Sequence, residues 1–314
     1  MPLVEAVQES RRAAPVVVWR LLDGKSGHEN QTLGLANALA ELMPLSVHDL
    51  PVVGGWRAWL ALLLGRCAQG AALPDPDLII GAGHATHVDM LACRRARGGR
   101  AVVLMRPSLP RRWFDLCVIP AHDGVGPSAG VLISQGALNH LRPSEEKASD
   151  IGLILVGGPS SHHGWDQAAL CDQVGAISVA DPRRWTVATS RRTPAATLAA
   201  LQALALDNLT IVPSANTAPG WLAIQLAPTP LVWVTEDSVS MLYEALTAGA
   251  ACGVLPVPRV RAGRVSAGVE ALLKGGTVTS FADWQGGQPL VPPKTHFDEA
   301  ARCARWIRQQ WFAR

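Results

Sequence analysis

Four short apolar segments of this chain each lead directly into a turn of glycine or small polar residues. The segments are 16–22, 78–80, 151–156 and 231–234, and a helical pattern follows the turn after the first, second and fourth. A strand that runs into a turn and then a helix is the repeating unit of parallel α/β proteins. The alternation therefore predicts parallel sheets with helices on both faces.

The chain also divides into two series of such units. A polar and charged stretch at 141–150 ends the first series, and a fresh apolar strand begins at 151. A chain of 314 residues is long enough for two domains that each bury a core. We expect an N-terminal domain at 1–145, a C-terminal domain at 146–296, and a basic amphipathic helix at 297–314 that returns towards the first domain.

Composition narrows the class of protein. The chain is 48% hydrophobic and 17% charged, which excludes extensive disorder, and its net charge of +3 is too small to imply a nucleic-acid partner. Six scattered cysteines without a C-x-x-C pair favour a reducing compartment. Residues 1–14 lack the apolar core of a signal peptide, and no run approaches the roughly 20 apolar residues of a spanning helix. We expect a cytoplasmic protein.

Residues 56–66 form an aromatic and apolar segment with an arginine near each end. So short a run favours a packed core helix, and a helix lying on a membrane face is the alternative. A second basic feature, the cluster of Arg94, Arg95, Arg97 and Arg100, is expected to be a solvated helix face, with contact to anionic lipid as its alternative.

The unit at 231–249 carries the clearest binding signal. Ser238 is a good N-cap, residues 239–248 contain neither glycine nor proline, and Gly249 can end the helix in the left-handed conformation. The free N–H groups at the helix start would then face an anion such as a diphosphate. These groups belong to Val239, Ser240 and Met241, and the polar residues Thr235, Glu236 and Asp237 lead into the helix.

Glu244 lies about a turn and a half into that helix, where it could reach a hydroxyl-bearing group such as a ribose. Glu236 and Glu244 also fit the E-x7-E spacing of many glycosyltransferases that use sugar nucleotides. The alternative is an ordinary strand, loop and helix with a solvated Glu236, since such caps occur throughout α/β folds.

Two doubly wound halves with glycine loops match the GT-B architecture, in which two Rossmann-like domains face each other across a cleft. Three motifs, DGKSGHENQ at 23–31, SRRTP at 190–194 and TEDSVSMLYE at 235–244, resemble those of the mitochondrial-fission ELM family. The resemblance implies a glycosyltransferase, because bacterial members are associated with lipopolysaccharide-type sugar transfer.

A more distant similarity is to the peptidoglycan enzyme that moves N-acetylglucosamine from UDP onto a lipid intermediate. The loop from Gly24 to His28, the turn from Gly81 to Gly83 and the helix residue Glu244 match its features. Residues 81–84 are poorer in glycine than in that enzyme, which implies a different acceptor pocket.

Sugar transfer from a nucleotide needs cations and N–H donors for the departing diphosphate. Arg191 and Arg192, preceded by Ser190, are the best cationic candidates, because guanidinium presents a forked set of donors to phosphate oxygens. Backbone donors could come from the turn at Gly157, Gly158 and Ser160.

An inverting transfer also needs a base near the acceptor hydroxyl. His28 is the candidate and Asp23 the runner-up, with a purely packing role for His28 as the alternative. If the transfer retains configuration, no base is required, and Glu236 could face the sugar. The expected acceptor side consists of Gly24, Lys25, Ser26, Gly27, Gly83 and His84.

Neither a metal nor a cofactor is expected. The pairs His84 with His87 and His162 with His163 lack further ligands at a metal-site spacing, so we interpret them as polar turn residues. The expected partners are a nucleotide sugar, a lipid-linked or lipopolysaccharide-type acceptor, and a membrane surface. The function that we expect is glycosyl transfer, with a nucleotide-sugar epimerase or a non-catalytic membrane-associated scaffold as alternatives.

Overall fold

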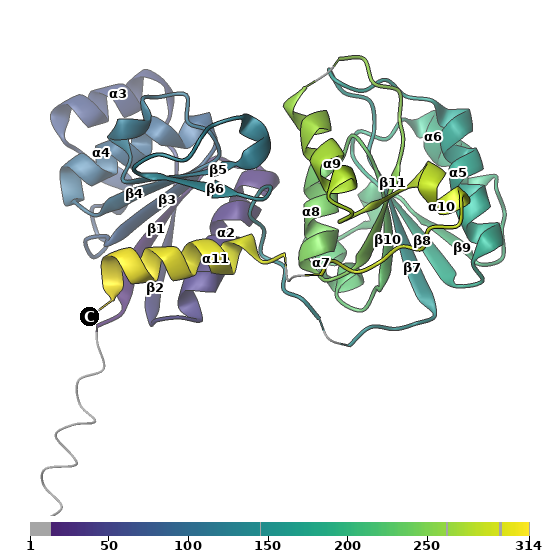
Figure 1. The fold of residues 1–314 in the computed structure, drawn as a ribbon. Coiled ribbons are helices and arrows are strands. Elements are labelled where there is room, and N and C mark those ends of the chain that lie inside the picture. Colours follow the sequence, from purple (N-terminus) through teal and green to yellow (C-terminus); the bar gives the residue numbers. More distant parts are fainter. Residues whose placement is uncertain (1–13, 145, 262, 295–296, 314) are drawn as a thin grey trace, which may run out of the picture. The chain divides into compact units, whose positions relative to one another are not determined.

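A computed structural model describes residues 14–144, 146–261, 263–294 and 297–313, which fold into two compact units (Figure 1). Unit 1 contains residues up to His140 together with Glu299 onwards, and unit 2 contains Leu141–Asp298. The boundaries predicted from the sequence were 145/146 and 296/297. The N-terminal segment used to predict that no signal peptide is present lies outside the described residues, except for Ala14.

Unit 1 is built on a parallel sheet of six strands in the order β2-β1-β3-β4-β5-β6. The strands are β1 (Val16–Leu22), β2 (Leu45–Pro51), β3 (Leu78–Ala82), β4 (Arg100–Leu104), β5 (Leu116–Pro120) and β6 (Val131–Ser134). Its helices are α2 (Ser26–Ala40), α3 (Gly55–Leu64), α4 (His87–Arg97) and α11 (Glu299–Ile307), and short turns of 3-10 helix occur at 68–70, 84–86, 111–113 and 121–123.

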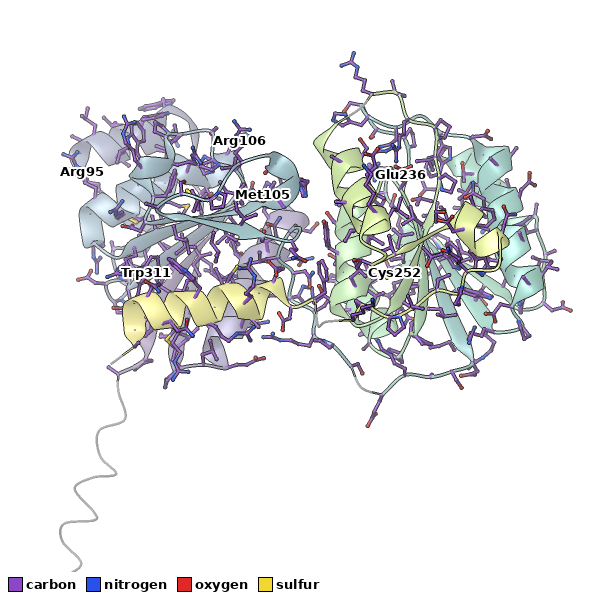
Figure 2. All side chains as sticks on the ribbon, viewed as in Figure 1. Arg95, Met105, Arg106, Glu236, Cys252 and Trp311 are labelled. Carbon is purple, nitrogen blue, oxygen red and sulfur yellow. A yellow bond between two sulfur atoms is a disulfide. The ribbon has the colours of Figure 1, made fainter. Side chains whose placement is uncertain are left out.

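Both faces of this sheet are buried. Val18 packs in a core with α2 and α11, whereas its neighbour Trp19 packs in a second core with α4, because successive side chains of a strand point to opposite faces. The chain continues past α11 as a π-helical turn at Arg308–Phe312, which contains Trp311, labelled in Figure 2. The centre of the Trp311 ring lies 4.7 Å from the guanidinium of Arg100. The C-terminal helix thus forms part of the core of unit 1.

Unit 2 repeats the architecture with the strand order β12-β11-β10-β7-β8-β9, again parallel. The strands are β7 (Ile151–Val156), β8 (Arg184–Thr189), β9 (Leu209–Val212), β10 (Leu231–Thr235), β11 (Ala251–Leu255) and β12 (Thr279–Ser280). The helices are α5 (Gln167–Ala180), α6 (Ala195–Gln202), α7 (Trp221–Leu226), α8 (Val239–Thr247), α9 (Arg264–Lys274) and α10 (Phe281–Gln285), with a 3-10 turn at 214–216. The predicted fold class, two doubly wound parallel sheets of the GT-B type, is confirmed.

Each sheet has a point where the strand order reverses. In unit 1 this point lies between β1 and β3, and in unit 2 it lies between β7 and β10. Loops that leave two such neighbouring strands turn to opposite faces of the sheet, which opens a crevice at the carboxyl ends. The predicted motifs at 23–31, 157–161 and 235–244 all begin at these two points.

The predicted core packing of 56–66 is wrong. Of the residues of α3 only Ala58 is buried, whereas Trp56 and Leu63 expose 69% and 70% of their surface. A short apolar run does not distinguish a buried helix from one whose apolar side faces outward. In α3 the small residue Ala58 and the partly buried Leu62 face the unit, and the large side chains point away from it.

The structure joins two cysteines that the sequence analysis did not pair. Cys67, which follows α3, forms a disulfide with Cys93 of α4, while the other four cysteines are free. The two residues are 26 positions apart, and only the packing of α3 beside α4 brings them together.

The stretch 141–150, predicted as a linker, is partly anchored: Lys147 donates hydrogen bonds to the carbonyl oxygens of Leu226, Ala227 and Ala248.

Candidate functional site

Three loops meet at the carboxyl edge of the sheet of unit 2. Gly157 and Gly158 follow β7, Arg192 follows β8, and Asp237 follows β10. The Gly158 N–H donates to Asp237 Oδ2 at 3.0 Å, and Arg192 Nη1 donates to the Gly158 carbonyl at 2.6 Å. Residues that the sequence predicted separately as nucleotide-binding are therefore one connected cluster.

The glycines of the β7 loop are required by how closely these loops approach. A Cβ added to Gly157 would lie 2.1 Å from both Asp237 Oδ2 and Ser238 Oγ, and one added to Gly158 would lie 2.2 Å from the Arg192 carbonyl oxygen. Contacts that close do not occur for real side chains, so only glycine fits at these positions. Ser160, by contrast, is exposed, and its hydroxyl accepts hydrogen bonds from the N–H groups of His162 and His163.

Asp237 occupies the centre of the cluster with a side chain that is completely buried. Its Oδ2 accepts hydrogen bonds from the Gly158 N–H, from the Ser238 hydroxyl and from Arg192 Nη2, the last at 2.6 Å. Its Oδ1 is buried and has no partner among the described residues. This oxygen faces the backbone of Gly157, since a Cβ there would lie 2.6 Å from it, so the cost of burying it is offset by the three bonds to Oδ2.

Two predicted roles change in this arrangement. Ser238 takes the N-cap position of α8, but its hydroxyl bonds to Asp237 and makes no capping bond to the helix. Arg192 is paired with Asp237, while Arg191 is exposed and has no ion pair with a described residue. Ser190 holds the loop itself, because its hydroxyl accepts the Arg192 N–H at 3.1 Å.

Glu236 is buried and paired as well. It is labelled in Figure 2 at the end of β10, whereas Cys252 marks the opposite end of the sheet. Arg259, from the loop after β11, donates to Glu236 Oε1 from Nε at 2.6 Å and to Glu270 from Nη1 at 2.5 Å. The bond to Glu236 is the main reason that the pKa of Arg259 is raised. Glu236 is therefore not the solvated residue of the alternative interpretation.

The N-terminus of α8 is free to bind. The first helical hydrogen bond joins the Leu242 N–H to the Ser238 carbonyl at 3.1 Å. The N–H groups of Val239, Ser240 and Met241 have no acceptor among the described residues, and Ser240 is exposed. Three unpaired amides at a helix start present donors and a positive dipole end to an anion. The helix ends as predicted, with Gly249 at φ +82°.

Glu244 lies one turn beyond Ser240 on the same side of α8, because residues four apart share a helix face. Burial raises the pKa of Glu244 to about 7. Its carboxylate has no hydrogen bond or ion pair with any residue in the described ranges. A partly buried acid without a partner, one turn from three unpaired helix amides, is typical of a ligand contact.

Unit 1 carries a second polar cluster at its own reversal point. Asp23 Oδ2 lies 2.8 Å from His28 Nδ1, and Asp23 Oδ1 accepts the Lys25 N–H at 3.2 Å. Burial by itself raises the pKa of Asp23, but these hydrogen bonds outweigh it and leave the pKa below the ordinary value. The side chain of Asp23 is 2% exposed, whereas that of His28 is 19% exposed, so the histidine is the accessible member of the pair.

Gly83, after β3, lies against the ring of this histidine. A Cβ on Gly83 would be 2.2 Å from His28 Cε1, and the residue has φ +78°, so only glycine fits. The helix α2 begins at Ser26, which places His28 in its first turn. The other predicted acceptor-side residues, Gly24, Lys25, Ser26, Gly27 and His84, are exposed around this pair.

The remaining histidines differ from the expectation in one respect. His87 is a buried residue rather than a polar turn residue: Ser108 Oγ lies 3.1 Å from its Nδ1, and burial lowers its pKa to about 4. His163 is likewise buried. Within the described ranges no three His, Cys, Asp or Glu side chains gather as a metal site would require.

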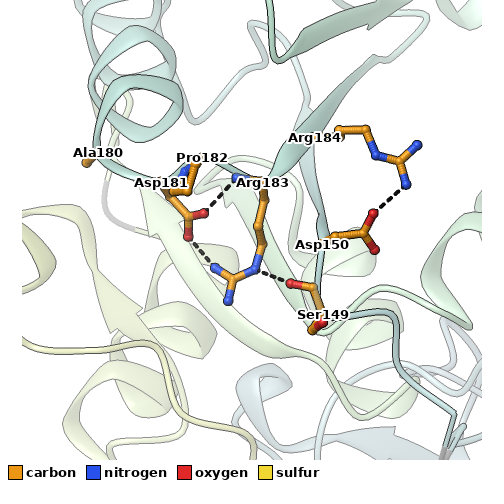
Figure 3. Close-up of a pocket in the computed structure, with 7 residues that line it drawn as sticks. All are labelled: Ser149, Asp150, Ala180, Asp181, Pro182, Arg183 and Arg184. Atoms are coloured by element: carbon orange, nitrogen blue, oxygen red, sulfur yellow. Dashed lines mark hydrogen bonds and ion pairs between the residues drawn. The ribbon is translucent and has the colours of Figure 1, made fainter.

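Two cavities lie at the other end of unit 2. One of about 510 Å³ is lined by Ser149, Asp150 and residues 180–184 (Figure 3), and one of about 290 Å³ includes the first residues of β7. The cations of the first cavity are paired internally, since Arg184 bonds to Asp150 at 2.6 Å and Arg183 bonds to Asp181 and to the Ser149 carbonyl. We place the candidate site at the carboxyl edge, where unpaired amides and carboxylate oxygens gather.

The sequence did not predict that Arg259 pairs with Glu236 or that Asp23 pairs with His28. Arg259 lies in the segment PVPRVRAGR, which has no motif that would mark it. The Asp23 pair had a signal, because a residue five positions before a helical histidine can reach back to it across the turn.

Solved structures of other proteins are similar in fold to this chain. No curated protein matches the sequence. The UDP-GlcNAc 2-epimerase of Methanocaldococcus jannaschii has a TM-score of 0.61 at 10% identity, covering 95% of this chain and 100% of that chain. The enzyme of the same name from Neisseria meningitidis, bound to UDP-GlcNAc, has a TM-score of 0.51 at 10% identity, covering 95% and 99%. The heptosyltransferase WaaC of E. coli with ADP has a TM-score of 0.46 at 12% identity, covering 76% and 87%.

The two 2-epimerase structures, whose TM-scores exceed 0.5, share the fold of this chain. The sequence gives a more specific result, because the family model described as mitochondrial fission ELM1 matches residues 26–311. That range includes His28, the β7 loop and the whole of α8. The chain therefore belongs to the mitochondrial fission ELM1 family.

Proposed function

We propose that this protein transfers a sugar from a nucleoside-diphosphate donor to an acceptor hydroxyl. The observation that carries the proposal is the start of α8, where three unpaired N–H groups lie one turn from the unpaired carboxylate of Glu244. The diphosphate binds the amides of Val239, Ser240 and Met241, and the ribose hydroxyls donate to Glu244. The solved 2-epimerase structure that contains UDP-GlcNAc has the same fold, which supports a nucleotide sugar as ligand.

Cations complete the donor site. Arg191 is exposed and has no described ion-pair partner, so its guanidinium is free to bind phosphate oxygens. Arg192 has a side chain that is 43% exposed, and it neutralises the buried Asp237 beside the helix start. Without Arg192, and without Arg259 on Glu236, two buried carboxylates would repel the diphosphate.

In the reaction, the acceptor oxygen attacks the anomeric carbon and the bond from that carbon to the diphosphate oxygen breaks. His28 removes the acceptor proton with Nε2, since Nδ1 is engaged by Asp23. The nucleoside diphosphate leaves with its negative charge stabilised by the α8 amides and the arginines. This scheme inverts the configuration, and it leaves Glu236 in its pair with Arg259.

We infer the acceptor class from the resemblance of the three motifs to the ELM family, whose bacterial members are associated with lipopolysaccharide-type sugar transfer. We propose a lipid-linked or lipopolysaccharide-core hydroxyl. The test is calorimetric titration with UDP, GDP, ADP and CMP, followed by incubation of the matching sugar nucleotide with lipid extracts and mass spectrometry of the products. The proposal predicts nucleotide binding that Glu244→Ala removes, and a product mass raised by one sugar. Lack of binding by every nucleotide would instead favour the non-catalytic scaffold.

A second candidate, a nucleotide-sugar epimerase, is favoured by the fold likeness to the two 2-epimerases, whose TM-scores exceed 0.5. The two reactions differ in their need for an acceptor. The sugar nucleotide would be incubated with the protein without any acceptor, and NMR of the sugar ring protons would monitor it. Isomerisation under these conditions would identify an epimerase.

A further inference from the structure

The outward side of α3 is apolar. Trp56, Trp59, Leu60, Leu63 and Leu64 expose between 44% and 70% of their surface, and we call these five residues the α3 face. Their spacing of three and four places them on one side of the helix, opposite Ala58 and Leu62. In a surface helix of a globular protein the polar residues face water, so the pattern of α3 is reversed. Large contiguous apolar patches on a protein surface mark contact sites.

Positive charge surrounds this face. Arg57 and Arg66 lie at the two ends of α3, and α3 contains no acidic residue. Arg95, labelled in Figure 2 on the neighbouring α4, reaches the end of α3, where a Cβ on Gly65 would lie 3.6 Å from its Nε. None of these three arginines has an ion pair with a described residue, whereas Arg94 and Arg97 of α4 are paired with Asp115 and Asp75.

The aromatic residues suit one particular environment. Trp56 and Trp59 present large amphipathic rings to the outside, and the guanidinium of Arg57 lies 5.7 Å from the centre of the Trp56 ring. Tryptophan is enriched where lipid headgroups meet acyl chains, and arginine beside it contacts the headgroups. No helix in the described ranges is long and apolar enough to cross a membrane, so any contact of α3 with lipid is interfacial.

The charge pattern also argues against a second copy of this chain as the occupant. A two-fold interface brings the same patch of both copies together, so the arginines around one α3 face would meet those around the other. Like charges opposed across an interface weaken association. An anionic lipid surface, by contrast, complements the arginines while its acyl region receives the leucines and tryptophans.

We propose that α3 is the membrane-docking element of this protein and lies in the interface of an anionic lipid bilayer. The α3 face enters the boundary between headgroups and acyl chains, and Arg57, Arg66 and Arg95 contact acidic headgroups. This proposal stands independently of the sugar-transfer chemistry, because it depends only on the surface of unit 1.

The experiment is co-sedimentation of the purified protein with vesicles of phosphatidylcholine alone and of phosphatidylcholine mixed with phosphatidylglycerol. Leu63→Gln removes an apolar side chain from the α3 face, and Ile224→Gln in unit 2 is its control, because Ile224 is 69% exposed and Leu63 70%. Arg66→Glu removes a cation beside the face, and Lys274→Glu is the control for charge, because both residues are exposed. Circular dichroism and nucleotide titration of each variant show whether the fold and the donor site are intact.

The wild-type protein should bind the anionic vesicles more tightly than the neutral ones, and added salt should weaken that binding. Leu63→Gln should reduce binding to anionic vesicles roughly tenfold, since burying one such side chain contributes about one tenfold step in affinity. Arg66→Glu should reduce binding to anionic vesicles alone, and neither control should change it. Equal binding of wild type and Leu63→Gln, or no binding to either vesicle, would overturn the proposal. A concentration-dependent dimer lost in Leu63→Gln without vesicle binding would assign the α3 face to a second copy.

Discussion

Asp23 Oδ2 lies 2.8 Å from His28 Nδ1 in the first turn of α2, so a buried carboxylate fixes an accessible imidazole. The contact occupies one ring nitrogen and leaves Nε2 without a partner among the described residues. An imidazole held in this way has one tautomer, with its lone pair on the outward nitrogen. The runner-up base of the sequence analysis, Asp23, is therefore better suited to orient the histidine.

His28→Ala should lower sugar transfer roughly 100- to 10,000-fold, because a positioned base contributes about that much to catalysis. Asp23→Asn should lower it by up to about 10,000-fold, because an asparagine amide that donates to Nδ1 would leave the proton on Nε2, the wrong tautomer for a base. Both variants should bind the nucleotide as the wild type does, because the proposed donor site lies in unit 2. Steady-state kinetics with calorimetry checks this, and a His28→Ala enzyme with full activity would remove the histidine from the mechanism.

Glu244→Gln should stabilise the free protein at alkaline pH while it weakens nucleotide binding. The folded pKa of about 7 lies above the ordinary value of 4.5, so folding favours the protonated acid. This contribution to stability is fully present below pH 4.5, and it is lost as the pH rises through 7. The difference in unfolding free energy between low and high pH is up to about 3 kcal/mol.

Urea unfolding at pH 5 and pH 8 measures this effect. The wild type should lose stability relative to Glu244→Gln over that interval, and Asp172→Asn, at an exposed position of α5, should follow the wild type. The same pair of variants tests binding, because only Glu244→Gln should weaken the affinity for a nucleoside diphosphate, by about tenfold or more. Parallel pH profiles for all three proteins would contradict the assignment.

Arg259→Ala should destabilise unit 2 by about 2 to 3 kcal/mol, because it leaves the buried Glu236 without its cation. The unpaired carboxylate should also weaken diphosphate binding by repulsion at the start of α8. The double variant Glu236→Gln, Arg259→Ala should recover part of both losses, since it removes the buried charge along with its partner. Thermal melts with and without nucleotide measure the two effects, and no recovery in the double variant would show that Arg259 acts by another route.

Reduction of the disulfide between Cys67 and Cys93 should destabilise unit 1 by about 3.5 kcal/mol, the loop-closure entropy for residues 26 positions apart. The melting temperature should fall on addition of dithiothreitol. Cys67→Ala with Cys93→Ala should melt at the lower temperature with or without the reductant. A thiol titration in denaturant provides the check, because the untreated protein should show four free thiols and the reduced protein six. Six thiols before reduction would refute the prediction.

The repeated strand and glycine turn specified the sheets well. A buried parallel strand is continuously apolar and a Gly-rich turn marks its carboxyl end, so β1, β7 and β10 could be located within one or two residues. The strand β11 was not recognised, because the sequence Ala-Cys-Gly-Val-Leu has little β-forming character of its own. Glycine is required at position 253 of this strand, because a Cβ there would lie 2.2 Å from the ring of Trp233.

The sequence by itself determined the alternating fold, the positions of the two glycine loops and the helix start at 239, because these follow from local pattern and from backbone geometry. Only the tertiary structure decided which charges pair. Arg192 with Asp237, Arg259 with Glu236 and Cys67 with Cys93 each join two segments of the same unit that lie well apart in the sequence. The tertiary structure also decided that the large apolar side chains of α3 are exposed. Pairing and exposure depend on which elements pack side by side, and residues distant in sequence carry no local signal of that neighbourhood.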